Sequence, residues 1–139
     1  MTAGEFQRLA GVWSNQLGSR LLLEVDADGR LSGSMHSSVG GVAGEHPLSG
    51  FARSSGEGRG VIGFVVAWDQ TSSVTSWSGH YDLRTGTISV NWLLTGNEFD
   101  ENEWQATRVG HDHFWRDVLA DTRPANVEAQ RASVPSDSR

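Results

Sequence analysis

Polar side chains able to bind or transform a small molecule recur in this sequence among large apolar residues. Six tryptophans are spread along its 139 residues. The polar candidates are an amide, three hydroxyl groups and a carboxylate: Asn15, Ser37, Ser73, Thr75 and Asp112. Hydrogen-bonding groups set among indole rings are typical of a pocket for a small organic ligand.

Each of these polar groups, taken alone, has a simpler structural interpretation. A hydrogen bond to the backbone or to a neighbour satisfies most buried polar side chains. As a set they are harder to place in an ordinary core, because each one left unsatisfied costs about 1–3 kcal/mol. The combination with the tryptophans therefore favours a binding pocket.

Two arrangements of histidine could support catalysis or metal binding, and strand geometry argues against both. His111 and Asp112 are adjacent, but neighbours on a strand point to opposite faces and cannot act as base and orienting carboxylate. His111 and His113 share a face, yet no third zinc ligand lies nearby. We therefore expect no catalytic residue and no metal site, and interpret both histidines as surface or interface residues.

Turn signals at intervals of about ten residues divide the chain into short apolar segments, which is the pattern of many short strands. Asp26-Ala27-Asp28-Gly29 and Arg84-Thr85-Gly86 are typical hairpin turns. No sustained helical period occurs before residue 115, so no major helix is expected there. Strands are predicted near 10–16, 19–25, 30–36, 47–54, 60–69, 73–82, 86–95 and 103–115. This order predicts an all-β fold, an eight-stranded antiparallel up-and-down β-barrel that can enclose one small ligand.

Alternation along these strands predicts which side chains face the barrel interior. The large apolar residues on the inner face include Trp13, Leu17, Leu31, Met35, Phe64, Val66, Trp68, Trp77, Val90, Trp92, Leu94 and Phe114. The same alternation places the five polar candidates inside. Arg108 is also on the inner face, but at the barrel end away from the pocket, where we expect a salt bridge.

Composition and charge exclude several classes of function. The net charge of −6 without any basic run argues against nucleic-acid binding. No apolar run approaches the 18 or so residues that a membrane-spanning helix needs, and the absence of cysteine excludes disulfides. No signal peptide is apparent in the first residues. We expect an N-terminal extension (1–8), a barrel domain (9–115) and a polar C-terminal tail (116–139) with a short helical turn at 117–121 followed by disorder.

Five motifs resemble the avidin and streptavidin family, in order and with nearly the family's spacing. They are GVWSNQLGS (11–19), VAWDQ (66–70), WSGHYD (77–82), NWLLTG (91–96) and WQATRVGHDHF (104–114). The resemblance implies a secreted, non-enzymatic streptavidin-like barrel that binds biotin with high affinity and assembles as a homotetramer. It implies no cofactor.

The resemblance also implies a role for each matching residue. Asn15 and Ser19 would donate to the ureido oxygen of biotin, and Ser37 and Asp112 would accept from its two N–H groups. Thr75 would contact the thioether sulfur, and Ser73 together with the backbone near Gly41 and Val42 would bind the valerate carboxylate. The fused rings would be enclosed by three indoles, those of Trp68, Trp77 and Trp92, and the remaining gaps would be filled by Leu17 and Leu94. Trp104 would enter the site of a neighbouring subunit, and His111 would lie at a subunit interface.

Two departures from the family pattern lie within these motifs. Met35 occupies a position where the family has a tyrosine whose hydroxyl donates to the ureido oxygen. The loss of that hydrogen bond would cost roughly 1–3 kcal/mol, or about one to two decades of affinity. The segment between Trp68 and Trp77 is also shorter than in streptavidin, which bears on contacts from Ser73.

Two other functions are compatible with a barrel of this size. A lipocalin-like carrier of an apolar ligand is the first, but the polar inner set argues against it. An esterase-like enzyme using Ser37 or Ser73 is the second. It is disfavoured because no histidine is expected on the inner face with either serine.

Overall fold

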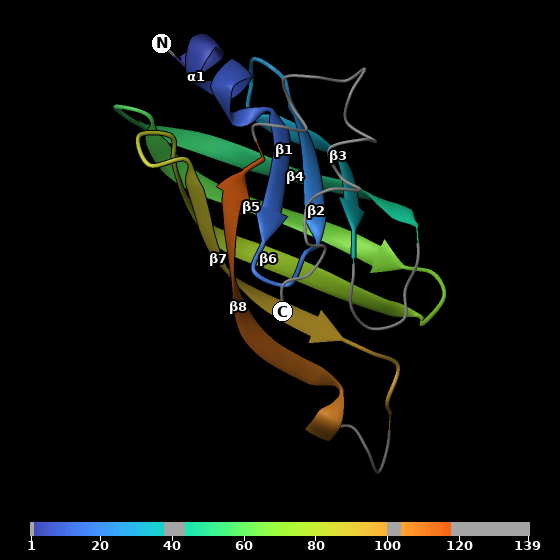
Figure 1. The fold of residues 1–139 in the computed structure, drawn as a ribbon. Coiled ribbons are helices and arrows are strands. Elements are labelled where there is room, and N and C mark those ends of the chain that lie inside the picture. The colour runs from blue at the N-terminus through green and yellow to red at the C-terminus, as the bar shows by residue number, and fades with distance from the viewer. Residues whose placement is uncertain (1, 38–43, 100–103, 118–139) are drawn as a thin grey trace.

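The computed structural model describes residues 2–37, 44–99 and 104–117. It is an eight-stranded antiparallel barrel preceded by one helix (Figure 1), which confirms the predicted fold class. The elements are α1 (Thr2–Leu9), β1 (Gly11–Asn15), β2 (Arg20–Val25), β3 (Arg30–His36), β4 (Glu45–Gly56), β5 (Arg59–Trp68), β6 (Ser73–Asp82), β7 (Thr87–Thr95) and β8 (Thr107–Arg116). Within these ranges no helix is long and apolar enough to cross a bilayer.

Each strand pairs with its sequence neighbour, and β8 returns to pair with β1. Most strand ends lie within two residues of the predicted positions. The exception is β8, which begins four residues later than expected. The β4–β5 hairpin is tight, because Gly56, Glu57 and Gly58 all adopt positive φ at its tip. Strand β4 continues two residues beyond its predicted end to reach this turn, whereas β5 has the predicted length.

Alternate burial along the strands confirms the predicted inner face. In β5, Ile62, Phe64 and Val66 are buried, whereas Val61 and Val65 between them are exposed on the outer surface. Because side chains alternate in this way, the barrel interior is continuous from strand to strand. It forms the apolar core of the molecule.

The N-terminal helix α1 was not predicted. Its apolar residues Phe6 and Leu9 are buried, with Phe6 only 4% exposed, and they join the core at one end of the barrel. The backbone oxygen of Leu9 accepts a hydrogen bond of 3.0 Å from Nε1 of Trp13. A two-turn helix with two apolar residues carries too little periodicity to be recognised, so its stability comes from this packing.

A polar contact also holds α1 in place. The hydroxyl of Tyr81, on β6, donates a hydrogen bond to a carboxylate oxygen of Glu5, and both side chains are buried. Burial, followed by the neighbouring Glu5 carboxylate, raises the pKa of Tyr81 above its ordinary value. The hydroxyl therefore remains a donor to Glu5 at neutral pH.

The seam that closes the barrel, between β1 and β8, is short. It contains the pairs Trp13↔Arg116, Ser14↔Trp115 and Asn15↔Phe114, whereas β7 pairs with β8 from Thr87 to Thr95. Side chains reinforce this seam. Oγ of Ser14 donates to Oδ2 of Asp117 at 3.0 Å, and Gln16 reaches across to β8.

Candidate ligand-binding site

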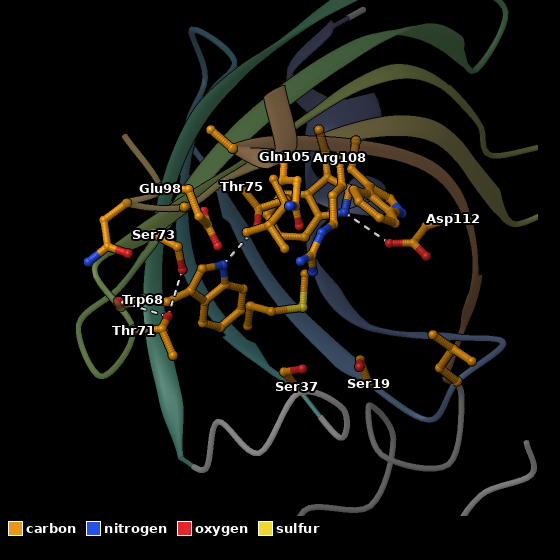
Figure 2. Close-up of a pocket in the computed structure, with 18 of the residues that line it drawn as sticks. Ser19, Ser37, Trp68, Thr71, Ser73, Thr75, Glu98, Gln105, Arg108 and Asp112 are labelled. Carbon is orange, nitrogen blue, oxygen red and sulfur yellow. Dashed lines mark hydrogen bonds between the residues drawn. The ribbon is translucent and has the colours of Figure 1, made fainter. Parts of the chain in front are cut away.

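A cavity of about 390 Å³ opens at one end of the barrel (Figure 2). Helix α1 lies at the other end, where it precedes the start of β1 (Figure 1). The walls of the cavity come from the ends of β1, β3, β5 and β7, the starts of β6 and β8, and the connections between them. The lining residues are Asn15, Leu17, Ser19, Met35, Ser37, Trp68, Thr71, Ser73, Thr75, Trp77, Trp92, Leu94, Gly96, Asn97, Glu98, Gln105, Ala106, Arg108 and Asp112. A cavity of this size and mixed polarity suits one small organic molecule.

The turn after β1 orients the amide of Asn15. Its Oδ1 accepts hydrogen bonds from the backbone N–H groups of Leu17, at 3.0 Å, and Ser19, at 2.9 Å. Gly18, with a φ of 87°, supplies the left-handed backbone conformation that this turn requires. Because the oxygen is bound to the backbone, the amino group Nδ2 is the part of Asn15 that can donate to a ligand.

The carboxylate of Asp112 lies on β8, is only 7% exposed and is held from two sides. Its Oδ2 accepts from Nε1 of Trp77 at 3.0 Å, and its Oδ1 accepts from Nε2 of Gln16 at 3.1 Å. A carboxylate offers about four acceptor positions. Asp112 therefore keeps the capacity to accept hydrogen bonds from a ligand.

Gln16 was not singled out from the sequence, although it positions Asp112. Its own Oε1 accepts from the backbone N–H of His113 at 3.1 Å, which fixes the side-chain amide against β8. The residue follows Asn15 directly in the chain. Its place in a turn gives no alternation from which to predict its direction, so only the folded structure reveals the contact.

Two of the tryptophan walls are anchored by specific contacts. Trp77 stacks on Phe64, with ring centroids 4.9 Å apart and an interplanar angle of 18°. Nε1 of Trp68 donates to Oγ1 of Thr75 at 2.8 Å. The threonine oxygen is thus an acceptor for the indole, and its own O–H remains able to donate.

The third indole, Trp92, depends on a glycine on the neighbouring strand. A Cβ atom added to Gly110 would lie 2.1 Å from Cζ2 of Trp92, so a side chain there would force the indole to move. Gly110 and Trp92 are paired residues of β8 and β7. The absence of a side chain on β8 therefore provides the space that the half-buried indole occupies.

The mouth of the cavity contains charged residues that were not expected there. The prediction that Arg108 lies away from the pocket is wrong, because Arg108 lines the cavity together with Gln105 and Glu98 (Figure 2). The strand register explains this position: Arg108 pairs with Leu94, which in turn pairs with Thr75. The expected salt bridge is also missing, since the ion pairs found in the described ranges do not include Arg108.

Most of the residues proposed from the sequence are brought together around this cavity. Those that line it are Asn15, Leu17, Ser19, Met35, Ser37, Trp68, Ser73, Thr75, Trp77, Trp92, Leu94 and Asp112. Trp104 is not among them, and its side chain is 79% exposed. Gly41 and Val42 fall outside the described residues, as does the helical turn proposed beyond residue 117.

The histidines are divided between the two faces of the barrel. His111 is exposed, and its ring nitrogens contact Oδ1 of Asn91 at 2.8 Å and Oγ of Ser89 at 3.1 Å. It therefore points away from the cavity that Asp112 faces, as alternation predicted. His46 was missed, because strand β4 begins two residues earlier than expected. Its buried ring packs edge-on against Trp68 with centroids 4.9 Å apart.

The expectation that no inner histidine accompanies the serines is therefore wrong. His46, however, is not among the residues that line the cavity. The hydroxyl of Ser73 is instead 2.6 Å from that of Thr71.

The fold and the cavity define a class of protein, namely closed eight-stranded barrels that can hold a small molecule among tryptophans at one open end. The sequence profile of the Avidin family matches residues 3–117, and the chain belongs to this family. It is 31% identical to avidin-related protein 4/5 of Gallus gallus over 116 residues, which are 78% of this chain and 77% of the relative. It is also 29% identical over 117 residues to avidin-related proteins 7 and 3 of the same species, with the same coverage.

Proposed function

We propose that this protein binds biotin non-covalently in the cavity and carries out no chemistry on it. The observation that carries the proposal is a pair of opposed hydrogen-bonding groups. Asn15 is held so that it can donate, and Asp112 is held so that it can accept. Membership of the Avidin family supports the same ligand.

The chemistry of a cyclic urea matches this pair. The ureido oxygen accepts hydrogen bonds, and the proposed donors to it are Asn15 and Ser19. The two ureido N–H groups donate, and the proposed acceptors are Asp112 and Ser37. A carboxylate acceptor polarises the urea and strengthens the bonds made at its oxygen.

The remaining lining residues suit the rest of biotin. Three indoles and Met35 offer apolar surface to the fused rings, and tryptophan contributes large contact area at low entropic cost. The O–H of Thr75 is able to donate to the thioether sulfur. Ser73, nearer the mouth, is the proposed hydroxyl partner of the valerate carboxylate.

Calorimetry with biotin and with its close relative desthiobiotin tests the proposal. Replacement of Asn15 by aspartate keeps the acceptor for Leu17 and Ser19 but removes the donor. We expect Asn15→Asp to weaken desthiobiotin binding by at least about 100-fold. The ureido oxygen is a hydrogen-bond acceptor, and in the variant it would face a carboxylate oxygen, which is also an acceptor, in place of a donor. Asn91→Asp makes the same chemical change on the outer face of β7 and serves as the control.

Two results would contradict this function. One is the absence of binding heat with biotin in a folded sample. The other is equal affinity of the parent protein and Asn15→Asp for desthiobiotin. Stronger binding of fatty acids than of biotin would instead favour a lipocalin-like carrier.

We further propose that the chain forms a homotetramer in which Trp104 covers the site of a neighbouring subunit. Trp104 is 79% exposed, so its large apolar ring is in contact with water. Covering this ring with a second subunit would be favourable. Light scattering should give the mass of four chains, and Trp104→Ala should speed biotin release. A mass of one chain would contradict this assembly.

The proposed location, secretion from the cell, rests on the family resemblance alone. The distribution of the protein between the culture medium and the cells of its source would test it. Recovery from the cells only would contradict secretion.

A further inference from the structure

The cavity carries one positive charge among the lining residues that the structure describes. Its ionisable lining residues are Glu98, Arg108 and Asp112, and the whole chain has a net charge of −6. An anionic ligand entering this cavity meets two carboxylates of its own sign. A cation near the place where the anionic group comes to rest would offset this repulsion.

Arg108 stands at a defined distance from the proposed urea-binding end. It shares the inner face of β8 with Asp112, four residues further along, which corresponds to about 13 Å along a strand. Between them lies Gly110, which pairs with Trp92. A ligand whose head group contacts Asp112 and whose rings lie beside Trp92 would extend its tail toward Arg108.

The guanidinium of Arg108 is available for such a contact. Its side chain is exposed, and it makes no hydrogen bond or ion pair with any other residue in the described ranges. Figure 2 shows it extending from β8 into the cavity. Guanidinium groups bind carboxylates through two parallel N–H···O bonds, a geometry that a neutral amide cannot reproduce.

We propose that Arg108 pairs with the carboxylate at the end of the ligand's tail and sets a preference for the free acid over neutral derivatives. The inference rests on the proposed biotin binding and deepens it. The head-group contacts determine that a cyclic urea binds. Arg108 determines which form of its tail binds best.

The test compares desthiobiotin with its neutral carboxamide, each measured by displacement calorimetry against biotin. The measured quantity is the ratio of the two dissociation constants. In Arg108→Gln we expect the preference for the acid to fall by about two- to fivefold, the range of an exposed ion pair. Arg108→Lys keeps the charge and should retain most of the preference. Salt at about 1 M should reduce it in the parent protein.

Arg53→Gln is the matched control, because it removes the same charge from the exposed outer face of β4. It should leave the ratio unchanged. A ratio that is equal in the parent protein and Arg108→Gln, with both ligands still bound, overturns the role of Arg108 and leaves biotin binding intact. Failure of both ligands to bind the folded parent protein overturns the two proposals together.

Discussion

The two ends of this barrel differ in how their buried polar groups are hydrogen-bonded. At the closed end, α1 inserts Phe6 and Leu9 into the core, and the polar groups that become buried are paired within the protein. Nε1 of Trp13 donates to the oxygen of Leu9, and Tyr81 donates to Glu5. The polar contacts described at that end are therefore made within the protein.

The open end has the same strand framework but retains unused hydrogen-bonding capacity. Asn15 and Asp112 are held by neighbours through part of their polar atoms only, so that a donor on one and acceptor positions on the other face the cavity. The comparison teaches that one end contributes to stability, whereas the other retains the groups to which we assign the proposed binding. Substitutions at the two ends should therefore have separable effects.

The largest expected effect is on stability, at the closed end. Phe6→Ala should lower the free energy of unfolding by about 3 kcal/mol, because it removes a buried aromatic ring from the core. Urea denaturation measures this change. Phe51→Ala, at a side chain that is 58% exposed on β4, is the control and should have a small effect. A large loss of ligand affinity in folded Phe6→Ala would contradict the separation of the two ends.

The next effect is on binding, at the open end. Asp112→Ala should weaken desthiobiotin binding by about 100-fold, since a charge-assisted hydrogen bond is lost and the indole N–H of Trp77 is left without its acceptor. Calorimetry measures the affinity. Asp28→Ala, in the exposed β2–β3 turn, removes the same charge far from the cavity. If both variants bound equally, Asp112 would have no role in the site.

A substitution at Met35 should raise the affinity for the ligand and would test the binding role of the open end. Met35 is buried and lines the cavity, and Met35→Tyr would restore a hydroxyl donor near the ureido oxygen. We expect desthiobiotin affinity to rise by about tenfold, the value of one added hydrogen bond. Urea denaturation should establish that the larger ring does not overpack the core. Unchanged affinity in a stable Met35→Tyr would mean that the ligand lies elsewhere.

The smallest expected effect is on how the free energy of unfolding depends on pH, through the Tyr81–Glu5 contact at the closed end. Burial and Glu5 raise the pKa of Tyr81, so the folded state holds its proton more tightly than the unfolded state does. The stability that this contributes is complete below the unfolded pKa of about 10 and is lost as the pH rises above it. The chain has one tyrosine, no cysteine and no lysine, so other side chains contribute little in that range.

Tyr81→Phe should lower the free energy of unfolding by about 1 kcal/mol at neutral pH. Above pH 10 or so, its unfolding free energy should depend less on pH than that of the parent protein. Denaturation at a series of pH values measures both. Parallel curves for the two proteins would contradict the assigned role of the Tyr81 hydroxyl.

The strands and their inner faces could be predicted because alternation is a local property of the sequence. The position of a residue along the barrel axis is not a local property, because it depends on the register between neighbouring strands. Arg108 was correctly assigned to the inner face, but its position beside the cavity depends on the register between β7 and β8. His46 was missed for a similar reason, since the start of β4 is set by pairing with β3.

The candidate site shows the same division. Residues in strands, such as Trp77 and Asp112, could be proposed from type and spacing together with the family resemblance. Gln16 could not, because a turn side chain follows no period and its contact with Asp112 crosses the seam. Helix α1 escaped prediction because two buried apolar residues in eight are too few to define a face.

The short pairing between β1 and β8 has a consequence for ligand binding. Asn15 belongs to β1 and Asp112 to β8, so a molecule bound to both bridges the joint at which the sheet closes on itself. Occupancy and closure are then thermodynamically linked, and each favours the other by an equal free energy. Amide protons along this joint should exchange more slowly when the proposed ligand is present, because bound ligand would oppose the parting of β1 from β8.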